Sequence, residues 1–275
     1  MKISIISNEI TLDFLEAARI GIEWGIRDYE IRYLKSGRVP YISEDEIERL
    51  IKIKNEFDLN ISAISPGLFK ISLSDEVQLK LEIEEHIYES FRLAEKFGTN
   101  NVIIFGFMKY EKEPQTNYVQ VLHILGRMTS LAEKYGFKLL LENHPGFWAD
   151  TSANTAKILD DVNSKHLRAN WDLANAAYAG EIPYPYGYLT IRHHIYSIHV
   201  KDFLTNKNGE PEFTVFGDGT IDWYGQLKAI INNKEVKYLT IETQVKPLIE
   251  NSNRNLFRVT NMLKDLEMDD KFVLK

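Results

Sequence analysis

Short apolar runs alternate along the chain with longer segments in which apolar residues recur every three or four positions. Such runs are typical of buried strands, and the longer period is typical of amphipathic helices. We expect strands at Lys2–Asn8, Asp28–Leu34, Asn60–Pro66, Asn101–Gly106, Lys138–His144, Leu167–Leu173, Ile195–Asp202 and Tyr238–Thr243. The clearest helical patterns lie between them, at Ser43–Phe57, Asp75–Phe97 and Asn117–Tyr135.

This alternation predicts an α/β protein with eight strand–helix units. Units of this kind, in a chain of 275 residues, close into a (β/α)8 TIM barrel. An open doubly wound sheet usually carries a glycine-rich phosphate loop after its first strand, and the sequence there is SNEITLDFL. No linker or change of composition divides the chain. We therefore expect a single TIM-barrel domain over residues 1–275.

Residues at the predicted helix ends agree with this interpretation. Ser43 is followed three residues later by Glu46, which is a capping-box pattern. Gly98 and Gly136 follow long helices, where glycine commonly forms a left-handed C-cap. Asp222 precedes WYGQLKAII and is expected to cap the helix that starts there.

Composition and charge narrow the range of partners. The net charge is −7, which argues against a general nucleic-acid surface or an anionic-membrane surface. The chain has no cysteine, so disulfides and thiolate chemistry are excluded. The apolar run in the N-terminal segment MKISIISNEI is too short for a signal peptide, so the segment favours a strand. We expect a cytoplasmic protein with no membrane partner.

Four acidic or imidazole residues stand at the C-terminal tips of consecutive predicted strands. They are Glu142, Asp172, His199 and Glu242. Three carboxylates and an imidazole brought to one barrel opening form a site for a divalent cation. The other interpretation is a salt-bridged polar barrel interior that involves Arg168 and Lys201.

Strand alternation adds further residues to the same opening. Side chains two positions apart share a face, so His144 accompanies Glu142 and Lys201 accompanies His199. Glu30 ends the second strand and can bind a polyol hydroxyl or pair with Arg32. Trp148 falls in a loop after a strand, where it can wall the pocket or pack in the core.

The segment Phe216–Trp223, FGDGTIDW, is the second signal in the sequence. It can be a glycine turn that leads into a capped helix. Its glycines can also let the backbone approach a ligand closely at the barrel opening.

Taken together, the segments YEIRYL, LLLENHPG, NWDLANA, HVKDF, FGDGTIDW and IET resemble the xylose isomerase-like TIM-barrel superfamily, the sugar phosphate isomerase/epimerase group. The resemblance spans nearly the whole chain. It implies one divalent metal ion (Mn, Mg, Co or Zn), a small sugar or polyol substrate, and a homodimer or homotetramer. It implies that Glu142, Asp172, His199 and Glu242 bind the metal and that His144 and Lys201 contact substrate.

One position departs from the pattern of that superfamily. Its ketose 3-epimerases and 3-dehydroshikimate dehydratases tend to carry His three residues after the metal-binding Asp, where this chain has Asn175. An amide can bind a hydroxyl but cannot shuttle a proton at neutral pH. Asn175 is therefore expected to bind substrate.

The favoured function is a metal-dependent isomerase or epimerase of a sugar or sugar derivative, which works through an enediolate. Glu142 and Glu242 would move the proton, while Lys201 and His144 orient substrate oxygens. A dehydratase of the 3-dehydroshikimate or inosose type is the first alternative. An abasic-site endonuclease and a non-catalytic sugar-binding barrel are the others, and the endonuclease fits poorly with seven histidines and an acidic chain.

Overall fold

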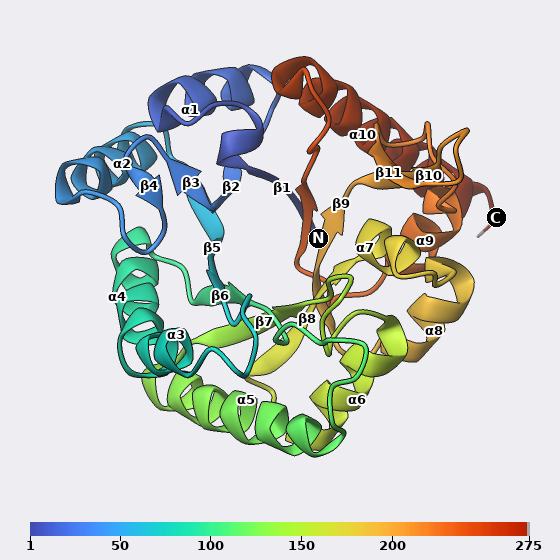
Figure 1. Ribbon diagram of the computed structural model, residues 1–275. Helices are drawn as coiled ribbons and strands as arrows, with labels where there is room; N and C mark the ends of the chain where they lie inside the picture. Colours follow the sequence, from blue (N-terminus) through green and yellow to red (C-terminus); the bar gives the residue numbers. More distant parts are fainter. Residues whose placement is uncertain (274–275) are drawn as a thin grey trace.

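The eight predicted strands form a closed parallel barrel, as Figure 1 shows, and the predicted fold class is confirmed. The computed structural model describes residues 1–273, with the side chains of residues 1–267. The barrel strands are β1 (Lys2–Ile6), β2 (Asp28–Ile31), β5 (Asn60–Leu68), β6 (Asn101–Ile104), β7 (Lys138–Glu142), β8 (Leu167–Asp172), β9 (Ile195–Val200) and β12 (Tyr238–Ile241). The first strand closes the ring by pairing with the last, with Ile3 beside Leu239.

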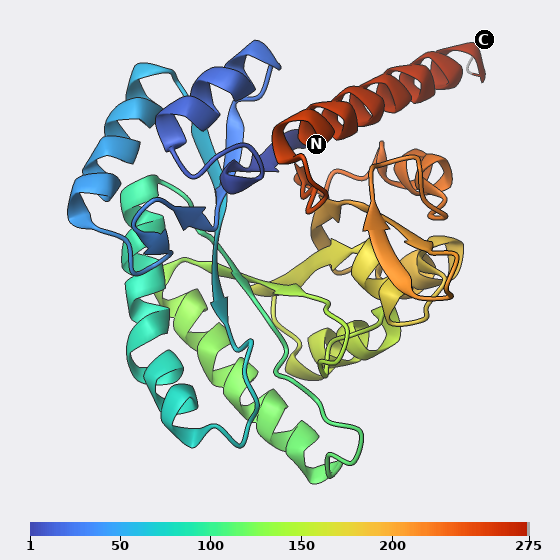
Figure 2. The same ribbon diagram turned by 45° about the horizontal axis from the view of Figure 1, so that its top comes forward.

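Helices surround the barrel and cover its outer face (Figure 1). They are α1 (Phe14–Glu23), α2 (Glu44–Glu56), α3 (Glu76–Leu81), α4 (Ile87–Phe97), α5 (Thr116–Tyr135), α6 (Ser152–Val162), α7 (Leu173–Tyr178), α8 (Tyr188–Ile191), α9 (Trp223–Ile230) and α10 (Leu248–Val273). The last of these, α10, extends past one side of the barrel in Figure 2. Within the described residues, no helix has the length and apolar character needed to cross a membrane.

Two hairpins stand at the end of the barrel where the strands finish. They are β3 (Tyr33–Leu34) with β4 (Gly37–Arg38), and β10 (Asp202–Thr205) with β11 (Pro211–Thr214). The predicted strands Asp28–Leu34 and Ile195–Asp202 were therefore too long. The chain leaves the barrel after Ile31 and after Val200, because each apolar run continues into a hairpin that pairs with itself.

The predicted helix Asp75–Phe97 is divided in the structure. A π-helical turn, Glu82–His86, separates α3 from α4. The buried carboxylate of Glu82 accepts the backbone amide of Phe69 at 2.5 Å, in the loop after β5. The turn thus places a buried acceptor beneath a loop at the open end of the barrel, a contact that helical periodicity alone does not encode.

The predicted helix ends are largely confirmed. Gly98 and Gly136 adopt left-handed C-caps, and Asp222 accepts the Gly225 amide at 2.8 Å. Ser43 accepts the Glu46 amide at 3.3 Å, which is half of the predicted capping box. The other half was wrong, because the Glu46 carboxylate instead accepts the amides of the β3–β4 turn.

The barrel interior is narrow and mostly polar beneath the open end. Ala63, Ile103 and Leu140 form a small apolar layer, separate from the main core between barrel and helices. Next to them the hydroxyls of Ser4 and Ser62 lie 2.8 Å apart. Small and polar residues thus fill the middle of the barrel beneath its open end.

Candidate metal centre and cavity

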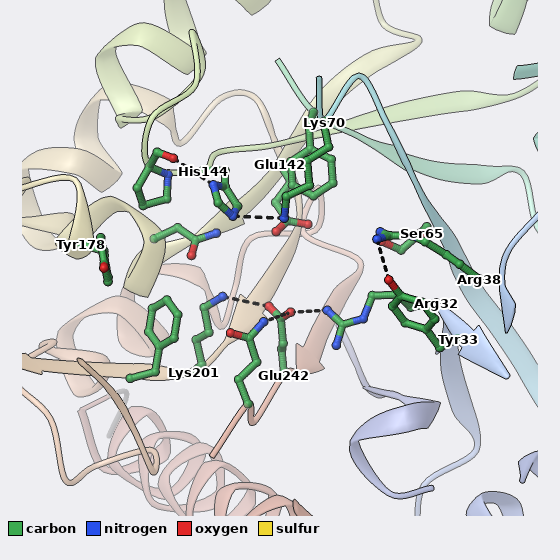
Figure 3. A pocket seen from close by; sticks show the side chains of 15 residues that line it. Arg32, Tyr33, Arg38, Ser65, Lys70, Glu142, His144, Tyr178, Lys201 and Glu242 are labelled. Atoms are coloured by element: carbon green, nitrogen blue, oxygen red, sulfur yellow. Dashed lines mark hydrogen bonds and ion pairs between the residues drawn. The ribbon is translucent and has the colours of Figure 1, made fainter. Parts of the chain in front are cut away.

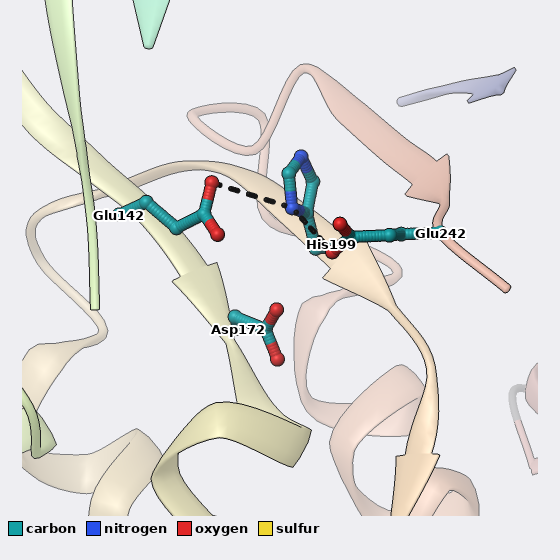
Figure 4. Close-up of side chains that lie close together, drawn as sticks. All are labelled: Glu142, Asp172, His199 and Glu242. Atoms are coloured by element: carbon teal, nitrogen blue, oxygen red, sulfur yellow. Dashed lines mark ion pairs between the residues drawn. The ribbon is translucent and has the colours of Figure 1, made fainter. Parts of the chain in front are cut away.

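Four side chains meet at the C-terminal ends of their strands, as Figure 4 shows. Glu142 ends β7, Asp172 ends β8, His199 lies in β9, and Glu242 follows β12 directly. One potential ligand atom from each lies within 4.8 Å of the others, and each residue is at most 5% exposed. We call these four residues the ligand cluster. They are the same four that the strand pattern of the sequence predicted to meet.

The imidazole of His199 is oriented by carboxylates on both of its edges. Its Nδ1 atom lies 3.0 Å from Glu242 Oε2 and 3.6 Å from Glu142 Oε2. Its Nε2 atom lies 3.0 Å from an oxygen of Glu30, on the edge away from the cluster. A carboxylate behind the ligating imidazole is the usual support of a metal-binding histidine. Nδ1 is therefore the nitrogen available to a cation.

The unsatisfied atoms of the cluster fit a divalent cation. Asp172 Oδ2 and His199 Nδ1 are buried, and among the described residues neither forms a hydrogen bond of normal geometry, although Lys201 Nζ lies 2.8 Å from the first and Glu242 Oε2 lies 3.0 Å from the second. A buried polar atom without a hydrogen bond is costly, and several buried carboxylates repel one another. Oxygen and imidazole donors together suit Mn²⁺, Mg²⁺, Co²⁺ or Zn²⁺. A cation between these side chains would satisfy both atoms and offset the repulsion.

Burial shifts the ionisation of the cluster away from ordinary carboxylates. Desolvation raises the pKa of Glu142 to about 7 and also raises the pKa of Asp172. For Glu242, burial alone would raise the pKa, but Lys201 and His199 beside it hold the pKa well below its usual value. Because a cation competes with protons for such groups, its binding releases protons.

Two positively charged side chains form ion pairs with carboxylates of the cluster. Lys201 is fully enclosed, with Nζ 2.8 Å from Asp172 Oδ2 and 3.1 Å from Glu242 Oε2. Arg32 lies 2.5 Å from the other Glu242 oxygen and 2.8 Å from Glu9. The sequence allowed an ion pair between Arg32 and Glu30. Among the described residues Arg32 pairs instead with Glu9 and Glu242. Arg32 and Glu9 were both missed as site residues, although each follows a strand tip.

A cavity of about 530 Å³ opens above the cluster (Figure 3). Its walls include five of the predicted site residues, namely Glu142, His144, Asn175, Lys201 and Glu242. The two glutamates therefore belong to both the cluster and the cavity wall, whereas Asp172 and His199 lie beneath the wall. A bound molecule can reach the glutamate carboxylates directly.

His144 and Asn175 are fixed by contacts within the chain. Burial lowers the pKa of His144 to about 4, so its imidazole is neutral near pH 7. Its Nδ1 lies 3.0 Å from the Pro145 carbonyl, and its Nε2 lies 3.2 Å from Lys70 Nζ. Asn175 donates its backbone amide to Asp172 and its side-chain amide to the Asn143 carbonyl. Both side chains are rigid parts of the wall.

Two other predicted site residues do not line this cavity. Glu30 is buried behind His199, where it bonds the imidazole. Trp148 is buried in the core, with the Tyr118 ring 5.8 Å away and Lys109 over its face. The sequence placed Trp148 in a post-strand loop correctly, but loop position alone does not fix which way a ring turns.

The glycine loop Phe216–Trp223 contacts an acidic side chain of the protein itself. Asp202 is buried and accepts the backbone amides of Gly217 at 2.9 Å and Gly219 at 3.3 Å. A Cβ atom at Gly219 would lie 2.1 Å from Asp202 Oδ1. The close backbone approach expected of these glycines is therefore made to Asp202, the residue after Lys201.

Comparison with known proteins agrees with this architecture. The sequence model of the family described as Xylose isomerase-like TIM barrel matches residues 16–266. An uncharacterized protein of Methanocaldococcus jannaschii, MJ1311, is 26% identical over 82% of this chain and 76% of its own length. An inosose dehydratase of Clostridium perfringens is 25% identical, and that match spans about half of each chain, 51% and 52%.

Solved structures with the same fold include both epimerases and dehydratases. A probable 3-DHS dehydratase of Bacillus anthracis, AsbF, superposes with a TM-score of 0.79 at 18% identity, covering 94% of this chain and 99% of that one. A D-tagatose 3-epimerase-like protein gives 0.79 at 19% identity, with 98% and 99% covered. The IOLI protein, solved with a zinc atom, gives 0.76 at 16% identity, with 98% and 97% covered.

Proposed function

The chain belongs to the xylose isomerase-like TIM barrel family, and we propose that it is a divalent-cation-dependent isomerase or epimerase of a sugar or sugar derivative. Relatives of the family act on sugars as epimerases or act as dehydratases, so proteins similar to this chain include both reaction types. The proposal rests mainly on the placement of Glu142 and Glu242 in two sites at once. Each carboxylate belongs to the ligand cluster and also borders the cavity.

The four cluster residues would hold the cation, with His199 presenting Nδ1. When bound, a divalent cation polarises a substrate carbonyl and favours loss of the proton on the neighbouring carbon, through an enediolate. Glu142 and Glu242 would take that proton and return it, because their oxygens are the carboxylate atoms exposed to the cavity. Return to the other carbon isomerises the substrate, and return to the opposite face of the same carbon epimerises it.

The remaining wall residues would position the substrate. Lys201 Nζ is held between Asp172 and Glu242 and would neutralise a substrate oxygen that develops negative charge. His144 is a neutral imidazole, so it would orient a substrate hydroxyl through a hydrogen bond without adding a positive charge. Asn175 donates one side-chain amide hydrogen to the Asn143 carbonyl, so it would offer its carbonyl oxygen or its second amide hydrogen to a hydroxyl.

Deuterium exchange tests the proposal directly. Protein loaded with Mn²⁺ would be incubated in D₂O with a panel of ketoses and aldoses and followed by NMR. We expect deuterium at the carbon next to the carbonyl without loss of water, and a loss of at least 100-fold in Glu142→Gln and in Glu242→Gln, the usual scale for an acid–base group. Glu48→Gln, on the exposed face of α2, is the control. Exchange that persists in both cavity variants would contradict the proposal.

A dehydratase is the second candidate, favoured by the inosose dehydratase match. It uses the same proton removal but expels a hydroxyl from the adjacent carbon. Inosose and 3-dehydroshikimate would be added to the same panel. Appearance of a conjugated carbonyl absorbance, rather than simple exchange, would assign the dehydratase reaction.

A further inference from the structure

Two basic side chains on the cavity wall take no part in the cluster. Arg38 comes from β4, and Lys70 lies in the loop after β5. Figure 3 shows both among the lining side chains, with their nitrogen ends toward the middle of the view. They therefore bring two positive charges from separate strand-end loops to one cavity.

The contacts of both cations are to neutral groups. The guanidinium of Arg38 donates to the Tyr33 hydroxyl at 3.1 Å and to the Ser65 carbonyl at 3.3 Å, and it lies over the Tyr33 ring. Lys70 Nζ lies 3.2 Å from His144 Nε2 and 4.7 Å from the centre of the Phe105 ring. In the part of the chain that the structure describes, neither forms an ion pair with a carboxylate.

The other two cations of the cavity show the contrast. Lys201 is paired with Asp172 and Glu242, and Arg32 is paired with Glu9 and Glu242. A charge that is drawn out of water without a counter-ion is costly. The cations beside the cluster are thus compensated, whereas Arg38 and Lys70 have no carboxylate at ion-pair distance among the described residues.

The guanidinium of Arg38 lies in a space that a glycine leaves open. Gly67 in β5 has a φ of +80°, and a Cβ atom there would lie 2.6 Å from the guanidinium carbon. Only a residue without a side chain leaves this space. The guanidinium therefore packs directly against the backbone of β5 at Gly67.

We propose that Arg38 and Lys70 form an anion subsite that binds a carboxylate or phosphate group of the substrate. This inference rests on the proposed function, because it assigns a charge to the substrate of the same cavity. Planar guanidinium donors match the oxygens of both groups, and lysine adds a point charge. A volume of about 530 Å³ accommodates a sugar acid or a sugar phosphate of small size.

The subsite also fixes the direction of the substrate. The carboxylates of Glu142 and Glu242 border the same cavity and repel an anion. The anionic end therefore lies against Arg38 and Lys70, and the uncharged carbonyl end faces the ligand cluster.

Binding of three six-carbon probes tests the inference. Sorbitol, gluconate and sorbitol 6-phosphate would be titrated calorimetrically into the protein, with and without Mn²⁺. We expect one or both anions to bind at least tenfold more tightly than sorbitol, with an affinity that falls as salt rises. The tighter of the two identifies the group as carboxylate or phosphate.

Matched variants separate this inference from a general effect of charge. Arg38→Gln and Lys70→Gln are each expected to weaken the preferred anion about tenfold while leaving sorbitol and Mn²⁺ binding unchanged. Arg92→Gln, which removes an exposed charge on α4, is expected to change neither. Failure of both anions to bind more tightly than sorbitol, or equal losses for sorbitol and anion in the two cavity variants, would overturn the subsite. Failure of wild-type protein to bind Mn²⁺ would instead overturn the proposed function.

Discussion

Glu30 holds His199 from the side opposite the ligand cluster, with 3.0 Å between a carboxylate oxygen and Nε2. The two residues are 169 positions apart in the sequence and come from β2 and β9. The contact leaves Nδ1 facing the carboxylates of the cluster. It joins the half of the barrel that supplies no cluster residue to the half that supplies all four.

Removal of the Glu30 carboxylate is expected to weaken cation binding. Glu30→Ala frees the imidazole to rotate, and losses of about 10–100-fold in metal affinity are typical when such a supporting carboxylate is lost. Titration with Mn²⁺, followed by electron paramagnetic resonance, measures the change. Asp28→Asn, two residues earlier in β2 and paired with Lys2, is the control. Unaltered Mn²⁺ affinity in Glu30→Ala would contradict the assigned orientation of His199.

Substitution of Glu142 is expected to abolish the stabilisation of the fold by a bound cation. In wild-type protein, Mn²⁺ at about 100 times its dissociation constant stabilises the fold by about 2.7 kcal/mol. Glu142→Gln keeps the shape of the side chain but removes a charged ligand, so this increment disappears. The metal-free variant is at least as stable as wild type, because one of several crowded negative charges is gone. Thermal unfolding with and without Mn²⁺ tests both statements, and an undiminished Mn²⁺ effect would refute them.

Two glycines are expected to respond in opposite directions to the same change. In Gly219→Ala the new Cβ would lie 2.1 Å from Asp202 Oδ1 and 2.4 Å from the Phe203 carbonyl oxygen, so the loop must move. Overpacking of this kind costs about 1–3 kcal/mol. Gly126→Ala, inside α5, places its new Cβ in open space beyond the helix's own backbone, and is expected to stabilise the protein by about 0.5–1 kcal/mol. Urea unfolding compares them, and equal effects would contradict the packing described around Asp202.

Asp13 is expected to give stability that depends on pH. Its carboxylate caps α1 through the amides of Leu15 and Glu16, and it pairs with Lys35 at 2.5 Å and Arg49 at 3.2 Å. The hydrogen bond from Lys35 lowers its pKa to about 2. Because the folded pKa lies below the unfolded value of about 4, this stability is full above pH 4 and is lost as pH falls toward 2.

Asp13→Asn keeps a capping side chain but cannot titrate. At pH 7 it is expected to be less stable than wild type by under about 1 kcal/mol, because water screens its half-exposed partners. The difference is expected to shrink as pH falls from 5 toward 2. Urea unfolding over this range, with the exposed Asp45→Asn as control, measures it. A difference that stays constant with pH would show that the ion pairs do not contribute.

The sequence was sufficient to predict the barrel and the four cluster residues, because both follow from local patterns. Apolar runs locate strands, and parallel strands in a barrel must end on the same side, so Glu142 and Glu242 had to meet. The contacts of Glu30, Arg38 and Lys70 could not be predicted in this way. Glu30 lies within β2, but its partner His199 is 169 positions away, and strand periodicity does not say which side chain a buried carboxylate meets. Arg38 stands in the β3–β4 hairpin and Lys70 follows Phe69, whose φ is positive, so their directions depend on turns that the apolar pattern does not specify.

The pairing of β1 with β12 has a consequence for the newly made chain. The first strand leaves the ribosome early, but its partner begins only at residue 238, and Arg32 finds Glu242 across 210 residues. Until then β1 exposes an open edge, which invites pairing with the wrong chain. The candidate metal centre is completed equally late, because Glu242 follows β12 directly and the full set of four ligands does not exist before that strand is made.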